Sequence, residues 1–410
     1  MKRACRTAAL ALALATVLAA PLPRAEEPPC KNHYILRPYC NPEDLALRWE
    51  TSAAAPWPTT VGHTATLLAD GRVLVVGGHR YSFDPVMDPD HRLYAGAQVF
   101  DPAAGTWAVT SPTLEHRYYH QAVRLLDGRV LVIGGDHELL WGDYLRSAEI
   151  FDPATGAWTR TGELGVSRGG FTASLLSDGK VLVAGGATPM GDTLGSAELY
   201  DPVSGTWSPT GDLGEPRYSH TATTLADGRV LVVAGMTHTL FELPLGSAEI
   251  FDPRSGGWAP AGAIPARAFH TASLTDSGEV LVAGGTRNAP SLEVGQYWWL
   301  EQASSAIFDP SRDEWRDAGA VIPRHHHLAV TLPGQRVLLV GGSAREGLTQ
   351  SYPAVAAFEV FGGSGWRQVE FESPPVSPGR FWSATPLADD SVLLLGDVPG
   401  ARAVRLRYRD

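Results

Sequence analysis

Arginine recurs at one position of a repeated pattern, and its guanidinium group is the side chain here best suited to holding an anion. Its N–H donors match the geometry of carboxylate, sulfate or phosphate. One interpretation is a partial basic ring around the mouth of a central channel. The other is structural: the arginines bind carbonyl or carboxylate groups of a neighbouring repeat. The recurring residues are Arg117, Arg168, Arg217, Arg267 and Arg324, with Arg380 one position displaced.

Aromatic residues form a second candidate set, because they gather beside the arginines and where the repeats differ most. Their faces can stack on sugar rings or anchor a protein partner, whereas the alternative is that they pack over the ends of the repeats. Variable loops on a fixed frame are the usual layout of a binding face. The candidates are Tyr118, Tyr119, Tyr218, Trp141, Tyr144, Tyr297, Trp298 and Trp299.

The run His325-His326-His327 is the most metal-like cluster, but we expect no metal site there. Consecutive residues of a strand point to opposite faces, so three in a row do not converge on one ion. His325 and His326 remain possible ligand contacts. The recurring Asp residues of Asp-Pro turns are expected to brace those turns, and no catalytic residue can be singled out. These are Asp101, Asp152, Asp201, Asp252 and Asp309.

The frame that carries these residues is a repeat of about 50 residues, marked by an apolar run that ends in two glycines. In the first copy, 63–68 is read as strand a, 72–76 as strand b, 97–100 as strand c, and Trp107 lies on strand d. Asp-Gly and Asp-Pro turns separate the strands. The glycine pairs are Gly77-Gly78, Gly134-Gly135, Gly185-Gly186, Gly284-Gly285 and Gly341-Gly342, with the variants Ala234-Gly235 and Gly396-Asp397.

The copies keep a strict register, which allows them to be counted. A landmark residue lies 14 positions before each first glycine position: His63, His120, Phe171, His220, His270, His327 and Trp382. Only six copies continue to a downstream tryptophan, and Trp49 lies one repeat before Trp107. An N-terminal strand is therefore expected to complete the last unit and close the ring. The predicted fold is an all-β, seven-bladed propeller of four-stranded antiparallel blades, with strand a innermost.

The glycine pair, the aromatic residue of strand c and the tryptophan of strand d together resemble the kelch repeat. The match spans residues 44–410, with spacings such as Phe151 to Trp158 and Tyr200 to Trp207. The resemblance implies a propeller like that of galactose oxidase, whose copper-radical chemistry needs a cysteine joined to a tyrosine. The propeller region here has no cysteine. We therefore expect no copper-radical activity and no cofactor.

The first 19 residues have the charged and apolar regions of a secretory signal, with cleavage possible up to residue 25. Residues 20–43 form a lead segment in which Cys30 and Cys40 are expected to pair in an oxidising compartment. The net charge is −11, and no basic surplus suggests nucleic acid. No second apolar stretch is long enough to anchor the chain in a membrane. The expected location is therefore the periplasm or the outside of the cell.

Because one propeller frame hosts unrelated activities, the fold alone does not define the function. The interpretation that we favour is a monomeric binding module without catalytic activity. Its recognition face would combine the b–c loops with the segments leading into strand a, and its partner would be a glycan or an extracellular protein. The alternative is a propeller enzyme, a hydrolase, lyase or non-copper oxidase, acting on an anionic substrate at the channel mouth.

Overall fold

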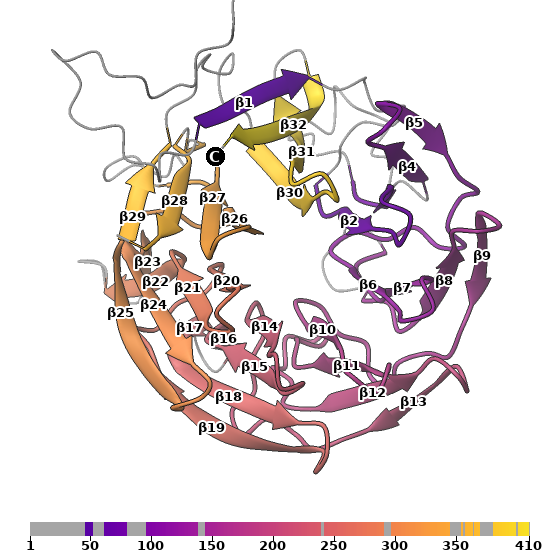
Figure 1. Cartoon of the computed structure of the whole chain (residues 1–410). Coiled ribbons are helices and arrows are strands. Elements are labelled where there is room, and N and C mark those ends of the chain that lie inside the picture. The colour runs from indigo at the N-terminus through magenta and orange to yellow at the C-terminus, as the bar shows by residue number, and fades with distance from the viewer. Residues whose placement is uncertain are drawn as a thin grey trace, which may run out of the picture. The chain divides into compact units, whose positions relative to one another are not determined.

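The computed structural model describes 46–51, 61–79, 96–137, 144–238, 242–290, 297–344, 354–355, 357–363, 365–369, 380–398 and 401–409. The predicted signal and lead segments, with Cys30 and Cys40, lie outside these residues, as does Trp141. Leu45–Arg409 form one compact unit. Within it, seven four-stranded antiparallel sheets are arranged around a common centre as a β-propeller (Figure 1). No helix among the described residues is long and apolar enough to cross a membrane.

Each sheet is one blade, and its strands run outward from the centre in the order a, b, c, d. The a strands of blades 1 to 7 are β2 (Thr64–Leu67), β6 (Gln121–Arg124), β10 (Thr172–Leu175), β14 (Thr221–Thr224), β20 (Thr271–Leu274), β26 (Leu328–Leu332) and β30 (Arg380–Pro386). The b strands are β3 (Val73–Val76), β7 (Val130–Ile133), β11 (Val181–Ala184), β15 (Val230–Val233), β21 (Val280–Ala283), β27 (Arg336–Val340) and β31 (Val392–Val398).

The outer half of each blade carries the aromatic pair of the repeat. The c strands are β4 (Ala97–Asp101), β8 (Ala148–Asp152), β12 (Ala197–Asp201), β18 (Ser247–Asp252), β24 (Ser304–Asp309), β28 (Glu359–Gly362) and β32 (Ala401–Arg409). The d strands are β5 (Thr106–Val109), β9 (Ala157–Arg160), β13 (Thr206–Pro209), β19 (Gly257–Ala263), β25 (Glu314–Ala320), β29 (Gly365–Gln368) and, in blade 7, β1 (Ala46–Thr51). In six blades the strand-c aromatic and the strand-d tryptophan are cross-strand partners with ring centroids 4.9–5.2 Å apart.

Blade 7 is built from both ends of the chain, which confirms the predicted closure. β1 pairs antiparallel with β32, and Trp49 stands opposite Leu406 as Trp158 stands opposite Phe151 in blade 2. The innermost strands contact one another all the way round, with β2 against both β6 and β30. Closure thus leaves the first and last blades as neighbours with no free sheet edge between them.

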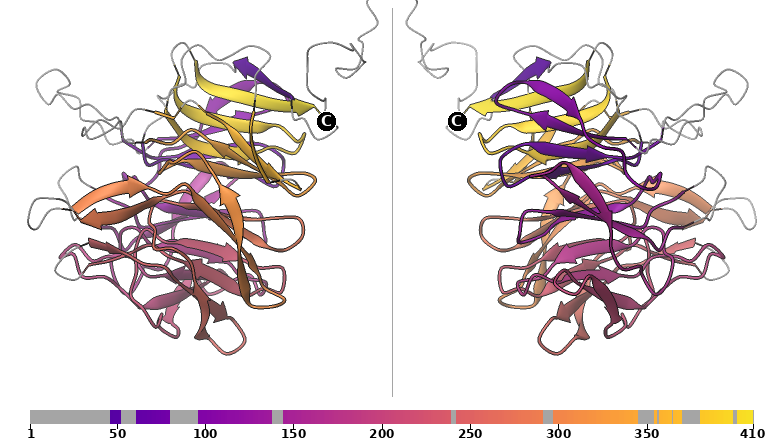
Figure 2. Two further views of the ribbon diagram at one scale, coloured as in Figure 1. Left: turned by 90° about the vertical axis from the view of Figure 1, so that its left-hand side faces the viewer. Right: turned by 90° about the vertical axis from the view of Figure 1, so that its right-hand side faces the viewer.

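Among the b–c connections that the structure describes, those of blades 4 and 5 extend into a short extra hairpin. In blade 4 it consists of β16 (Met236–His238) and β17 (Glu242–Pro244), and in blade 5 of β22 (Thr286–Pro290) and β23 (Tyr297–Glu301). β17 contacts β22, and the β22–β23 hairpin projects beyond the blades in the side view (Figure 2). The two hairpins therefore raise one sector of the face on which the b–c connections lie.

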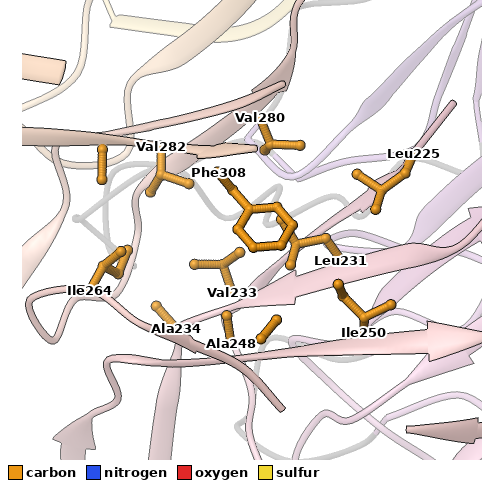
Figure 3. Close-up of a cluster of buried hydrophobic side chains, with 12 residues drawn as sticks. Leu225, Leu231, Val233, Ala234, Ala248, Ile250, Ile264, Val280, Val282 and Phe308 are labelled. Carbon is orange, nitrogen blue, oxygen red and sulfur yellow. The ribbon is translucent and has the colours of Figure 1, made fainter. Parts of the chain in front are cut away.

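The hydrophobic core lies between the blades. Between blades 4 and 5, the ring of Phe308 is surrounded by aliphatic side chains from both sheets, including Leu231, Val233 and Val282 (Figure 3). In blades 1 to 5 the b strands are buried along their whole length, so both faces of these blades are covered there. Burial of an aliphatic side chain of this size stabilises a fold by roughly 1.5–3 kcal/mol.

The repeat needs two glycines at this point because there is no room for a Cβ: the first glycine is packed against the next blade and the second against the landmark residue of its own blade. A Cβ at Gly77, whose φ is +63°, would lie 2.3 Å from the carbonyl oxygen of Arg117 and 3.0 Å from the imidazole of His120 in the next blade. A Cβ at the second glycine, Gly135, would lie 2.8 Å from the Cβ of the landmark residue of its own blade, His120. The landmark residue and the glycine pair are therefore parts of one packing unit.

The landmark histidines also bond the blades to each other. Each Nε2 lies 2.8–2.9 Å from a hydroxyl of the preceding blade, in the pairs His120 with Thr64, His220 with Thr172, His270 with Thr221, His327 with Thr271, and His63 with Ser383. All five side chains are buried. Phe171 occupies the landmark position of blade 3 and packs on Gly134 instead.

Substitution of a first glycine should be costly wherever the neighbouring blade is in closest contact. We expect Gly185→Ala to lower the free energy of unfolding by about 2 kcal/mol or more, because a left-handed alanine is strained and its Cβ meets a backbone oxygen. That Cβ would lie 2.4 Å from the Arg217 oxygen. Urea denaturation measures the loss. Blade 4 already carries Ala234 there, with φ +55°, so Ala234→Gly is the matched control, and an equal loss in both would contradict the explanation.

Candidate functional site

In blades 1 to 6, the face on which strand a begins brings three residues of each blade together at the centre. Two of them lie between the recurring arginine and the landmark residue, and the third follows the glycine pair. Isolated bridges join the first and third, for example Tyr118 with Asp136, Tyr218 with Met236 and His325 with Ser343. We call this set of positions the inner rim. The repeat fixes its backbone, and its side chains differ from blade to blade.

The five recurring arginines lie behind the inner rim, not on it. Their side chains are completely buried, so a ligand on this face cannot contact them in this conformation. In blade 3, Arg168 donates from Nη1 to the carbonyl oxygens of Gly185 (2.7 Å) and Ser196 (2.9 Å), and from Nη2 to Glu198 (2.7 Å). The other four, Arg117, Arg217, Arg267 and Arg324, bind the same carbonyl positions of their own blades.

This placement corrects the expectation of a basic ring around the mouth. Of the two roles left open by the sequence, the geometry supports the structural one, and the partners belong to the same blade, not to a neighbouring one. The Glu198 carboxylate also accepts the N–H of Gly165, which lies in the segment arriving from blade 2. Arginine and glutamate thus fasten that segment to the blade. The sixth candidate, Arg380, has its backbone in β30 opposite Asp397.

The middle rim position has a left-handed backbone in six blades. Two blades have glycine there, Gly62 and Gly170, with φ +75° and +63°. Four keep a side chain in spite of the strain: Tyr119, Ser219, Phe269 and His326, with φ between +50° and +54°. A left-handed residue other than glycine costs about 1 kcal/mol or more, and such strain is concentrated at functional sites. Neighbouring blades are also linked here, since Tyr119 N–H donates to the Gly62 oxygen at 2.8 Å.

Blades 1 and 2 together provide one aromatic wall of the rim. The rings of His79 and Tyr118 are 4.6 Å apart, and those of Tyr118 and Tyr119 are 5.3 Å apart. Tyr118 is buried, whereas Tyr119 is 54% exposed. Burial and the nearby Asp136 carboxylate raise the pKa of Tyr118 above its usual value, and burial raises that of half-buried Tyr144. Tyr118 is therefore a neutral phenol, and Tyr119 is the exposed residue of this wall.

Blades 5 and 6 provide a second wall. Phe269 stacks on the exposed ring of His326 with ring centroids 4.2 Å apart, and the rings of Phe269 and half-buried Trp299 are inclined by 61° with centroids 6.3 Å apart. Next to His326, the Nδ1 of His325 lies 3.3 Å from Oε1 of Glu301. Trp299 and Glu301 both come from β23, two residues apart, and therefore point to the same face of the hairpin.

Blades 3 and 4 form the part of the rim between the two walls. Blade 3 contributes Gly169, Gly170 and Ala187. Blade 4 contributes Tyr218, which is half-buried, together with Ser219 and buried Met236. The inner rim is thus asymmetric: two sectors carry aromatic and titratable side chains, and between them the rim of blade 3 has only small residues.

The predicted aromatic candidates are divided by the structure. Tyr118, Tyr119 and Tyr218 lie on the rim, and Trp299 reaches it from the blade 5 hairpin. The ring of Tyr144 covers Gly169, where a Cβ would come within 2.4 Å of it. Tyr297 and Trp298 have their backbone in β23. Sequence reasoning missed His79, Phe269 and Glu301; the signal for Phe269 was its place directly before a landmark histidine, as Tyr119 precedes His120.

The three consecutive histidines point apart as expected, but they precede β26 and the cause is the left-handed backbone of His326, φ +50°, not alternation along a strand. His327 points into the blade interface and bonds Thr271, whereas His326 is exposed on the rim. Among the residues that the structure describes, no group of three or more His, Cys, Asp or Glu side chains is arranged to hold a metal ion. The turn aspartates brace their turns as predicted: Asp101 Oδ1, for example, accepts the N–H groups of Ala103 and Ala104.

Fold and repeat define the chain as a seven-bladed β-propeller that carries kelch motifs, and the sequence matches the Kelch motif at residues 117–165 and 168–214. A fungal alcohol oxidase of the AA5 family, solved with copper, is similar in structure: the TM-score is 0.65 at 17% identity, over 88% of this chain and 76% of the oxidase. YjhT is similar with a TM-score of 0.57 at 13% identity, over 78% of this chain and 99% of YjhT. No curated protein matches the sequence. Likeness at these identities concerns the fold alone.

Proposed function

We propose that this chain is an exported binding module that recognises a glycan at the inner rim. The observation that carries the proposal is the retention of aromatic side chains at left-handed positions, where Tyr119 is 54% exposed although glycine would relieve the strain. Export rests on the secretory signal expected in residues 1–19. The partner would be met in the periplasm or outside the cell.

A glycan suits the rim better than a protein partner for two reasons. Aromatic faces such as those of Tyr119 and Phe269 stack on the apolar faces of sugar rings, while adjacent polar groups accept and donate hydrogen bonds. The polar groups are at hand, because Asp136, His325 and Glu301 stand beside the two aromatic walls. The second reason is that the exposed apolar residues of this face, such as Tyr119 and Met190, are scattered over several blades and do not form the continuous patch typical of a protein interface.

The test removes the aromatic ring by a substitution that the left-handed backbone tolerates. A glycan that binds the wild type is first identified on a glycan array. We expect Tyr119→Gly and Phe269→Gly to weaken binding of that glycan at least about tenfold, since stacking contacts of this kind contribute about 1 kcal/mol or more. Both variants should keep the free energy of unfolding within about 1 kcal/mol, because glycine suits a left-handed backbone. Isothermal titration calorimetry with the glycan and urea denaturation give the two values.

Ser219→Gly is the matched control, since it makes the same backbone change where no ring is lost. It should bind like the wild type. Wild-type affinity in both aromatic variants would overturn the glycan site at the rim. Binding to no glycan, with capture of a protein that the aromatic variants lose, would move the proposal to a protein partner.

The alternative of an enzyme is favoured by one observation. His325 Nδ1 lies 3.3 Å from the Glu301 carboxylate, and their side chains are only 13% and 8% exposed. A carboxylate that orients an imidazole is a frequent arrangement for general acid–base catalysis. Product formation from an array hit, lost in His325→Asn while binding persists, would establish this second function. Binding without turnover supports the binding module.

A further inference from the structure

Four of the five buried arginines have a glutamate beside the guanidinium group. The Nη2 atom of Arg117 lies 2.5 Å from Oε1 of Glu149. In the pairs Arg168–Glu198, Arg217–Glu249 and Arg324–Glu359, Nη2 lies 2.7 Å from a carboxylate oxygen. Arg117 and Arg217 have a second carboxylate within 3.7 Å, Glu115 and Glu215. A buried charge is tolerable only when it is compensated in this way. The repeat therefore carries its own counter-ion at this position.

Arg267 in blade 5 departs from this pattern. Ala306 stands where the other blades have the glutamate, and the residue two before the arginine is Pro265, which has no N–H to donate. The guanidinium group is completely buried and binds only neutral acceptors: the carbonyl oxygens of Pro265 (3.1 Å), Gly284 (3.1 Å) and Ser304 (2.9 Å), and Ser304 Oγ (2.8 Å). No carboxylate of the described residues forms an ion pair with it.

The uncompensated charge persists at neutral pH. Burial lowers the pKa of Arg267 to about 10, so the group is still protonated at pH 7. The backbone around it is unchanged, because Ala306 pairs with Val282 as Glu249 pairs with Val232. Arg267 Nε also binds the carbonyl two residues earlier, as Arg217 Nε does. The Nη2 atom of Arg267 is therefore directed towards the position that the glutamate carboxylate occupies in the other blades. Ala306 has no side-chain atoms beyond Cβ to fill that position.

We propose that Arg267 binds a small monovalent anion, such as chloride, on the Nη2 side, in place of the missing glutamate carboxylate. A monovalent anion neutralises one guanidinium charge, as each single glutamate does in blades 3 and 6. The donor available to such an ion is the Nη2 side of the guanidinium group, because Pro265 has no main-chain N–H. A larger oxyanion such as sulfate would carry excess charge into the apolar surroundings formed by Ile264, Val282 and Phe308.

The experiment compares thermal unfolding in sodium chloride and in sodium gluconate at one ionic strength, so that general screening is constant. We expect the Tm of the wild type to be about 2–4 °C higher in chloride, because an ion bound only by the folded state stabilises it. Bromide should act in the same way. Arg267→Met and Ala306→Glu should abolish the difference, the first by removing the charge and the second by supplying the carboxylate.

Ala306→Gly is the control that keeps both the charge and the space, and it should retain the chloride effect. If Arg267→Met fails to fold, Ala306→Glu still decides, since it leaves the arginine in place. The site would be overturned if the Tm of the wild type were the same in chloride and in gluconate. It would also be overturned if chloride raised the Tm of Ala306→Glu as much as that of the wild type. Anomalous scattering from a bromide-soaked crystal should place the ion within hydrogen-bond distance of Arg267 Nη2, and a map without that peak also overturns it.

Discussion

Replacing Arg217 with methionine lowers the free energy of unfolding by about 3–5 kcal/mol, while the same change at Arg267 lowers it by only about 1–2 kcal/mol. Both variants lose the same carbonyl and hydroxyl contacts. The difference is the glutamate: Arg217→Met leaves the buried Glu249 carboxylate without its cation, whereas Arg267 has no carboxylate to leave behind. Urea denaturation at neutral pH measures both values.

The double variant Arg217→Met/Glu249→Leu separates the loss of a charge partner from the loss of packing. Removing both charges should recover at least half of the Arg217→Met loss, because a buried ion pair is often replaced by apolar residues at little cost. Equal losses in the two arginine variants, or no recovery in the double variant, would show that the carboxylates do not set the cost of breaking these contacts.

Lowering the pH from about 7 to about 5 reduces the free energy of unfolding by about 2 kcal/mol for each landmark histidine that must stay neutral. Burial, together with the nearby arginine, lowers the pKa of His220 and of His270 to about 3. In the unfolded chain these histidines take up protons near pH 6.5, whereas in the folded protein they stay neutral down to about pH 3. Their contribution to the free energy of unfolding is therefore complete above pH 6.5 and is lost as the pH falls towards 3. His120 and His327 have pKa values lowered in the same direction.

Blade 3 supplies the control for this acid sensitivity. Phe171 occupies the landmark position there and Gln121 the position of the partner hydroxyl, so an apolar ring is already tolerated by the frame. His220→Phe/Thr172→Val should therefore flatten the dependence of unfolding free energy on pH between 7 and 5 by about 2 kcal/mol. An unchanged slope in this variant would mean that carboxylates, not the histidines, govern acid unfolding.

The architecture followed from the sequence because propeller blades repeat their local chemistry. Glycine pairs, Asp-Gly turns and the spacing of Phe151 to Trp158 each report on neighbouring residues, and these are visible without long-range knowledge. Closure by Trp49 was also predictable, since a missing strand in one unit matched a spare strand elsewhere. The number of repeat copies and their register thus determined blade number and strand order.

The candidate site was less predictable, because repetition does not say whether a repeated residue faces solvent or the interior. The recurring arginines fit a basic ring as well as a buried contact. One signal did distinguish them: glutamate stands two residues before the strand-c aromatic wherever the arginine is paired, as Glu198 precedes Tyr200. Blade 5 combines Arg267 with Ala306, which separates it from the rest. The only sign in the sequence that Tyr119 and Phe269 have a left-handed backbone was glycine at the equivalent position of two other blades, Gly62 and Gly170.

The pairing of β1 with β32 also makes the fold sensitive to whether its synthesis has finished. Residues that are adjacent in the last blade, such as Trp49 and Leu406, are separated by almost the whole length of the propeller in the chain. A nascent chain lacking β32 offers β1 no partner and leaves β31 with an unpaired edge, which invites aggregation. The ring can therefore close only after the last strand has been made, so a prematurely terminated product remains recognisable to proteases as unfinished.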